Sequence, residues 1–234
     1  MKDLTTGKPI KIILLFAIPL FIGQLFQLFY SLADTRIVGA ILGETSLAAV
    51  GATTTLSDFL IGLLNGFTNG CAIIIATYFG SGDRANMKKA IGGTILSGVV
   101  LSVLISAGCL LFLPRILGAL NVADFLMAES KAYIGIVLAG LLAATLYNVC
   151  AAILRALGDT FTPLLFLILA AVLNVVLDYT LIKYGNMGVA GAALATVIAQ
   201  AVSAVLCFFY MKIRYPELSL SREDFRFDKI IYKK

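Results

Sequence analysis

The sequence predicts an all-α integral membrane protein, a six-transmembrane-helix bundle without a soluble domain of its own. Of its 234 residues, 60% are hydrophobic and only 13% are charged, which is more apolar side chain than a water-soluble globule can bury. The apolar residues occur in long runs, and a helix needs about 20 residues to cross the hydrocarbon core of a bilayer. The length therefore allows six membrane-spanning helices with short connections.

The chain begins with two predicted helices, each followed by glycine residues that favour a helix end. The first, residues 11–38, follows three lysines and continues past Leu28 without a small-residue cleavage site, so we interpret it as a retained helix rather than a signal peptide. Gly39 and Gly43 separate it from the second helix, residues 47–79. The run Gly-Ser-Gly-Asp at 80–83 ends that second helix.

The next three predicted helices also end at proline or glycine residues. The third, residues 90–113, ends at Pro114, and the fourth, residues 125–154, ends before Gly158. The fifth, residues 164–184, begins beside Pro163, which the first turn of a helix tolerates because the N–H there needs no partner. Gly185 and Gly188 close it.

The sixth helix, residues 189–211, completes a predicted lobe that spans residues 1–211. Residues 212–234 are predicted to be either a basic cytoplasmic tail or a linker cut off at the start of a further helix. The second alternative rests on Ser-Arg-Glu-Asp at 221–224, which resembles a capping box.

The basic residues predict the orientation. All but four of the 18 Lys and Arg residues fall in the N-terminus, the second and fourth connections and the tail, and Arg155 is the one in the fourth connection. The four exceptions are Arg36, Arg115, Lys131 and Lys183. The positive-inside rule therefore places both termini in the cytoplasm.

The composition argues against several functions. There is no His, so the commonest metal ligand and the usual base at neutral pH are absent, and hydrolytic and zinc enzymes are disfavoured. The net charge is +5, but the basic residues flank apolar segments and no nucleic-acid-binding motif accompanies them. We therefore expect no nucleic acid partner. The four cysteines stand singly in apolar runs and are expected to be small buried hydrophobes: Cys71, Cys109, Cys150 and Cys207.

Polar residues recur at helical spacing inside four of the six helices, which indicates a shared polar interior. We expect five of them to line a substrate cavity: Gln24, Gln27, Asp58, Asn65 and Gln200. For Gln200, and for the neighbouring Ser203 and Asn69, ordinary hydrogen bonding between helices is the competing interpretation. Asp58, near mid-membrane, remains open between contact with substrate and structural hydrogen bonding.

A second group of polar residues falls at one depth. Counting about 1.5 Å per residue places Asp34, Tyr133, Asp178 and Thr196 roughly 6 to 12 Å from the outer helix ends. Two carboxylates meeting there without an obvious basic partner would bind a proton or a cation. We therefore expect H⁺ or Na⁺ as the coupling ion, with no cofactor and no metal beyond Na⁺.

Pro19 lies inside the first helix, where it removes one backbone hydrogen bond and tends to kink the axis. We interpret it as a hinge, although prolines without a mechanical role also occur in membrane helices.

The sequence resembles the multidrug and toxic compound extrusion (MATE) family along essentially its whole length. Five stretches carry the resemblance in the same order: Ile18-Pro-Leu with Asp34-Thr and Val38-Gly, residues 47–52, residues 154–160, Asn174 with Asp178, and residues 188–196. The resemblance implies a secondary transporter, not an enzyme, that exports drugs or organic cations in exchange for H⁺ or Na⁺.

The resemblance also implies a site and a missing partner. Asp34, Asn174, Asp178 and Thr196 would bind the cation, with Tyr133 beside them. The family has twelve helices in two lobes and this chain matches the first, so a second six-helix lobe or a second copy is expected as its partner. The expected location is the plasma membrane, as a multi-pass protein of a bacterial inner membrane.

Three alternatives remain open. A lipid-linked precursor flippase of the same superfamily would be favoured by arginines lining the interior, where we expect none. A membrane-embedded lipid transferase would need a paired-Asp motif such as D-x-x-D facing a loop, and no such pair occurs. A channel is possible, but a carboxylate pair that must be neutralised fits coupled exchange better.

Overall fold

The computed structural model describes residues 9–218 and residue 224, and the described chain is helical without strands. The α-helices are α1 (Pro9–Leu42), α2 (Glu44–Gly80), α3 (Arg84–Leu111), α4 (Leu113–Ala119), α5 (Met127–Ala139), α6 (Leu141–Ala156), α7 (Phe161–Tyr179) and α8 (Val189–Arg214). Short 3₁₀ turns cover Asp124–Leu126 and Pro216–Leu218, and a π turn covers Thr180–Tyr184.

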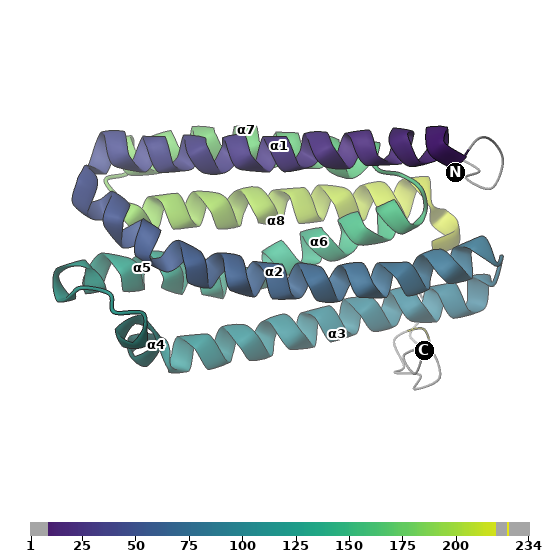
Figure 1. Ribbon diagram of the computed structural model, residues 1–234, viewed down its shortest axis with the longest axis horizontal. Helices are drawn as coiled ribbons and strands as arrows, with labels where there is room; N and C mark the ends of the chain where they lie inside the picture. The colour runs from purple at the N-terminus through teal and green to yellow at the C-terminus, as the bar shows by residue number, and fades with distance from the viewer. Residues whose placement is uncertain (1–8, 219–223, 225–234) are drawn as a thin grey trace.

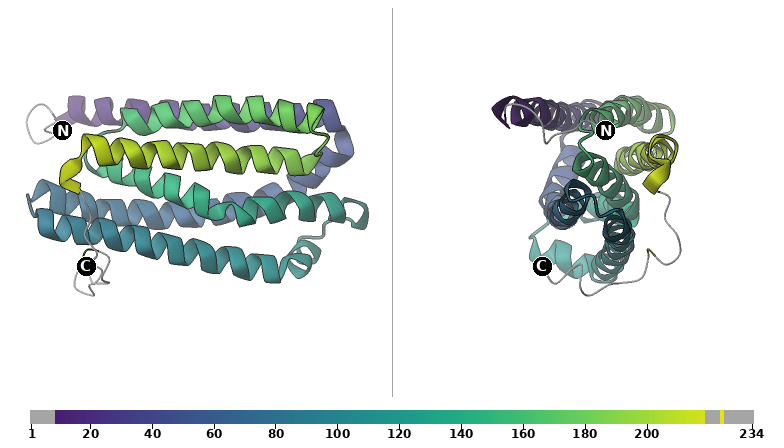
Figure 2. Two further views of the ribbon diagram at one scale, coloured as in Figure 1. Left: turned by 180° about the vertical axis from the view of Figure 1, so that it is seen from behind. Right: turned by 90° about the vertical axis from the view of Figure 1, so that its right-hand side faces the viewer.

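The long helices lie along one axis of the molecule (Figure 1). α1 and α7 lie side by side at one face, α2 and α3 at the other, and α6 and α8 lie between them (Figure 2). The start of α1, the α2–α3 turn, the α6–α7 connection and the end of α8 meet at one end of the bundle, and the other connections lie at the opposite end. This alternation is the one that the predicted topology requires.

The prediction of an all-α, six-span membrane protein is confirmed. Five helical segments are long and apolar enough to cross a membrane: Ile13–Leu42, Glu44–Gly80, Arg84–Leu111, Phe161–Tyr184 and Val189–Arg214. A sixth span results when Asp124–Ala139 and Leu141–Ala156 are taken together. Large apolar side chains such as Phe21, Phe59 and Leu104 are exposed around the bundle, which suits a lipid solvent.

The fourth predicted helix, residues 125–154, is not one straight helix. It divides into α5 and α6, which meet at Gly140 with a bend of 43°. A Cβ atom on Gly140 would lie 2.2 Å from Cγ2 of Val197, so α8 can approach this point only because the residue is glycine. The bend therefore coincides with a close approach of α8 that only glycine permits.

Other boundaries also differ from the predicted ones. α1 continues through Gly39 to Leu42, and the single residue Gly43, with φ at 87°, makes the turn to α2. α3 begins at Arg84, because Asp83 caps it by accepting a hydrogen bond from the Asn86 N–H at 3.1 Å. The third span ends before Leu113, where the separate helix α4 begins.

The C-terminal boundary was predicted at residue 211, whereas α8 extends to Arg214. The predicted capping box at 221–224 lies outside the described residues except for Asp224.

Side chains also join the helices. Ser130 Oγ of α5 donates to Ala49 O of α2 at 3.1 Å, and Ser106 Oγ of α3 donates to Leu138 O of α5 at 2.7 Å. Such bonds satisfy polar groups where water is absent and hold neighbouring helices together. Cys71, Cys150 and Cys207 are buried free thiols and Cys109 is half-buried, as expected for small apolar residues.

Asp159 ties the α6–α7 connection to the end of α8. Its Oδ1 accepts the Thr162 N–H at 3.0 Å, and its Oδ2 accepts the Tyr210 and Tyr215 hydroxyls at 3.5 and 3.4 Å. Tyr147 OH of α6 donates to the Pro163 carbonyl at 3.0 Å. As predicted, Pro163 lies in the first turn of α7.

Candidate functional site

An acidic pair lies between α1 and α7, which pack side by side. Asp34 comes from the C-terminal part of α1 and Asp178 from the last turn of α7. Their carboxyl groups are close enough to share one hydrogen bond when one of them carries a proton. Asp178 is fully buried, and neither of its oxygens nor Oδ1 of Asp34 has a hydrogen-bond donor among the described residues. A bound proton or cation would satisfy these acceptors.

Neutral groups from α1, α7 and α8 surround the pair. The Thr196 hydroxyl accepts from Tyr30 OH and from Asn174 Nδ2, each at 3.2 Å, and donates to Ala192 O. Asn174 is fully buried, and its Oδ1 also lacks a donor among the described residues. The structure therefore brings Asp34, Asn174, Asp178 and Thr196 together.

The local sequence explains this arrangement. Asn174 and Asp178 are one helical turn apart and so share a face of α7. The chain then widens into the π turn Thr180–Tyr184, a geometry that often occurs at functional sites. Gly185 ends this turn, since a Cβ atom there would lie 2.6 Å from the Leu181 carbonyl oxygen.

Two tyrosines border the acidic pair. Tyr133 of α5 is 9% exposed, and Asp34 and Asp178 are among the acidic groups whose charge acts on it. Tyr30 is not among the predicted site residues, although it precedes Asp34 by one turn on the same face of α1.

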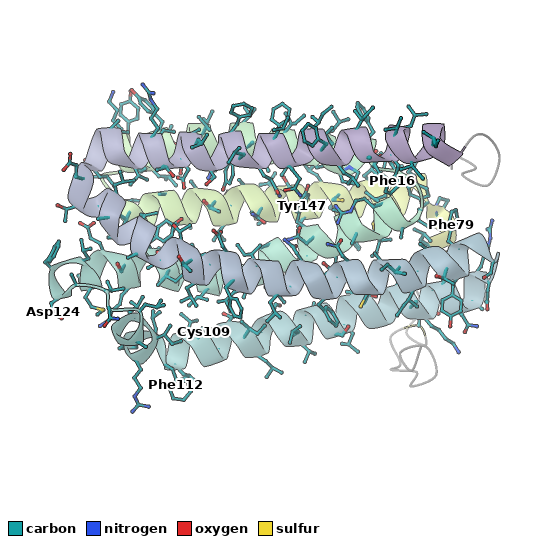
Figure 3. The ribbon with its side chains drawn as sticks, in the orientation of Figure 1. Phe16, Phe79, Cys109, Phe112, Asp124 and Tyr147 are labelled. Carbon is teal, nitrogen blue, oxygen red and sulfur yellow. The ribbon has the colours of Figure 1, made fainter. Side chains whose placement is uncertain are left out.

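A pocket opens between α1, α6 and α7, closer to the N-terminal end of α1. Gln24 and Gln27 line it, and so does Pro19. The sequence analysis missed the contribution of α6, which supplies Tyr147, labelled in Figure 3, together with Asn148 and Arg155. Asn148 and Arg155 lie two turns apart on one face, a spacing that was visible in the sequence.

The other predicted cavity residues are not part of this pocket. Asp58 is exposed on α2 and Asn65 is half-buried there, and neither lines the pocket. Gln200 of α8 is half-buried, and its Oε1 has no donor among the described residues. Ser203 donates to Phe166 O at 3.2 Å, the ordinary hydrogen bond between helices that was its competing interpretation.

Arg155 corrects an expectation. We expected it in a connection and expected no arginine lining the interior, but it belongs to the last turn of α6 and lines the pocket. Its Nη2 donates to Asn69 Oδ1 at 3.3 Å, and no carboxylate among the described side chains pairs with it. The apolar run ends at Leu154, so the sequence pattern placed the helix end two residues early.

The family model MatE matches residues 19–180. The probable multidrug resistance protein YpnP of Bacillus subtilis is 29% identical over 209 residues, which cover 89% of this chain and 47% of YpnP. The probable multidrug resistance protein NorM of Thermotoga maritima is 28% identical over 91% of this chain and 45% of NorM. The chain spans about half the length of the curated relatives it matches.

The chain is also similar to about half of each of two solved structures. A MATE protein in the bent conformation superimposes with a TM-score of 0.89 at 30% identity, covering 97% of this chain and 51% of that protein. A MOP superfamily transporter from Pyrococcus furiosus, for which the reverse polarity of its binding pocket suggests a different function, gives a TM-score of 0.89 at 28% identity, covering 97% of this chain and 50% of that protein.

Proposed function

The chain belongs to the MatE family, and we propose that it acts as the N-terminal lobe of a secondary active transporter that exports drugs or organic cations in exchange for H⁺ or Na⁺. Members of the family are multi-pass membrane transporters and not enzymes. The relatives named above are multidrug resistance proteins, which supports a drug-like substrate for this chain.

The buried acidic pair carries this proposal. Asp34 and Asp178 place two carboxyl groups together with open acceptors, so holding both as anions without a bound cation is costly. One proton shared between them, or one Na⁺ bound by carboxylate, amide and hydroxyl oxygens, relieves that cost. Asn174 Oδ1 is open as an oxygen ligand, and the Thr196 hydroxyl becomes one if it gives up a hydrogen bond that it accepts from Tyr30 or Asn174.

Coupling requires that the cation bind one conformation better than another, because equal affinity for both would shift no equilibrium. α1 is suited to transmit the shift, since it carries Asp34 of the cation site and Gln24 and Gln27 of the pocket. Two negative charges on Asp34 and Asp178 repel each other and so oppose the close packing of α1 against α7. Neutralising the pair removes this repulsion and lets the two helices approach. We propose that Pro19, which lies inside α1 and lines the pocket, acts as the hinge.

The test is dye efflux from vesicles that contain the complete gene product, with proton and sodium gradients imposed separately. Asp178→Asn removes one carboxylate and is expected to abolish export driven by either gradient while leaving membrane insertion intact. Asp124→Asn is the matched control, because Asp124 is an exposed carboxylate at the opposite end of the bundle from Phe16 (Figure 3). Normal export by Asp178→Asn at equal expression would refute the site.

A further inference from the structure

The pocket between α1, α6 and α7 contains a cationic group for which the described part of the chain supplies no anionic partner. Arg155 lines the pocket and is hydrogen-bonded to the neutral Asn69. No Asp or Glu among the described residues lines the pocket. A half-buried guanidinium inside a membrane bundle is costly unless it is paired, and intramembrane charges of this kind commonly mark ligand sites.

A purely structural role explains only part of this arrangement. Arg155 lies in the last turn of α6, where a cation interacts favourably with the helix dipole. That interaction does not require neighbouring amides, yet Gln24, Gln27 and Asn148 line the same pocket and supply further N–H donors. Together these groups form the donor set that recognises a carboxylate or a phosphate.

Apolar side chains also line the pocket, among them Leu20 of α1 and Leu164 and Leu167 of α7. Gly23 leaves room beside them, because a Cβ atom at that position would only reach contact distance, 3.6 Å from Leu167 and 3.7 Å from Leu164. A ligand with an anionic head and a hydrocarbon tail complements the polar and the apolar residues of this lining.

This pocket is distinct from the cation site. Gln24 and Asp34 are ten residues apart on α1, which corresponds to about 15 Å along the helix. We propose that the Arg155 pocket binds the anionic head group, phosphate or carboxylate, of an amphiphilic molecule. This inference does not rest on cation coupling at Asp34 and Asp178, so either can fail alone.

Binding can be measured on the full chain in a neutral detergent. Thermal unfolding exposes the buried thiols Cys71, Cys150 and Cys207, so a thiol-reactive dye reports the midpoint. Dodecyl phosphate is expected to raise the midpoint saturably, whereas dodecyltrimethylammonium, which has the same tail and the opposite charge, is expected not to. Equal shifts with both probes would overturn the proposal.

Two variants locate the site. Arg155→Gln is expected to weaken the apparent affinity for dodecyl phosphate at least about tenfold, the usual effect of losing a charge-assisted hydrogen bond. Arg214→Gln is the matched control, because it removes an exposed positive charge at the same end of the bundle and should bind as the wild type does. Unchanged affinity in Arg155→Gln, or an equal loss in Arg214→Gln, would contradict the proposal.

Gly23→Leu provides a test that keeps the arginine. Its side chain is expected to occupy the pocket beside Leu164 and Leu167 and to weaken binding, and wild-type affinity in this variant would show that the probe binds elsewhere. Short-chain phosphatidylglycerol, compared with phosphatidylcholine, then identifies the source of the ligand. Stabilisation by phosphatidylglycerol indicates a lipid head group, and stabilisation by dodecyl phosphate alone indicates a soluble anionic amphiphile.

Discussion

At the scale of single residues, the cation site is defined by acceptors that the protein leaves open. Asp178 has two carboxylate oxygens without a donor among the described residues, and Asn174 has a free amide oxygen. The Thr196 hydroxyl links the uncharged residues of the site, because it accepts hydrogen bonds from both Asn174 and Tyr30. Tyr30 thus positions Thr196 from a third helix.

Tyr30→Phe is predicted to weaken the binding of the coupling ion without abolishing it. The change removes the 3.2 Å hydrogen bond to Thr196, worth about 1 kcal/mol, so the apparent ion affinity should fall about fivefold. The ion dependence of dye efflux measures this. Tyr184→Phe is the control, since Tyr184 is 71% exposed. If both variants transport alike, Tyr30 does not position the site.

Single residues also show what the sequence could and could not reveal. Asp34, Asn174, Asp178 and Thr196 could be found because carboxyl, amide and hydroxyl groups at matching depths in apolar helices stand out against their surroundings. Tyr30 was missed although it precedes Asp34 by one turn, because an aromatic residue in such a helix is equally consistent with lipid contact. Arg155 was misplaced because hydropathy locates the end of an apolar run and not the end of the helix.

At the scale of helices, the number of spans followed from the lengths of the apolar runs, but the division of the fourth did not. The division coincides with a contact between Gly140 and Val197 of another helix, which no local pattern reports. Helix starts were also misjudged. α3 begins six residues before its predicted start of 90, since Asp83 supplies a cap that makes a polar first turn favourable.

Gly140→Ala is predicted to destabilise the bundle by about 1 to 3 kcal/mol, because its methyl group would overlap Val197. Val197→Ala in the same chain should recover most of that loss, even though Val197→Ala alone loses packing. Thermal unfolding of the two single variants and the double variant gives the coupling energy. Additive effects would mean that the bend does not depend on this contact.

The cap of α3 is predicted to depend on pH. Hydrogen bonds from the backbone and side chain of Asn86 lower the pKa of Asp83 below its ordinary value of 3.8. The stabilisation is therefore complete above 3.8 and is lost as the pH falls through the lowered pKa. Hydrogen exchange of the first turn of α3 should accelerate in that range, and Asp83→Asn, which keeps an accepting oxygen, should remove the dependence. A wild type that shows no change would exclude the carboxylate as the cap.

At the scale of the whole molecule, polar groups remain exposed on helices that also face lipid. Gln24 and Gln27 of α1 and Asp58 and Asn69 of α2 are all exposed. Leaving such groups against hydrocarbon would cost several kcal/mol. Transporters built from repeats place their binding site between two bundles that rock against each other. We therefore predict that a second bundle, either a further six-helix lobe or a second copy, covers these faces.

The prediction is tested by the mass and activity of the chain alone. In mild detergent, light scattering should detect association with a second copy or with the separately expressed second lobe, and dye transport after reconstitution should require that partner. Single cysteines at Asp58 and Asn69, in a background without the native cysteines, should lose reactivity toward a water-soluble reagent when the partner binds. A cysteine at Asp124, which is exposed in the turn before α5, should keep its reactivity. A monodisperse monomer that exports dye against an ion gradient would show that the polar faces need no cover and that one lobe is sufficient.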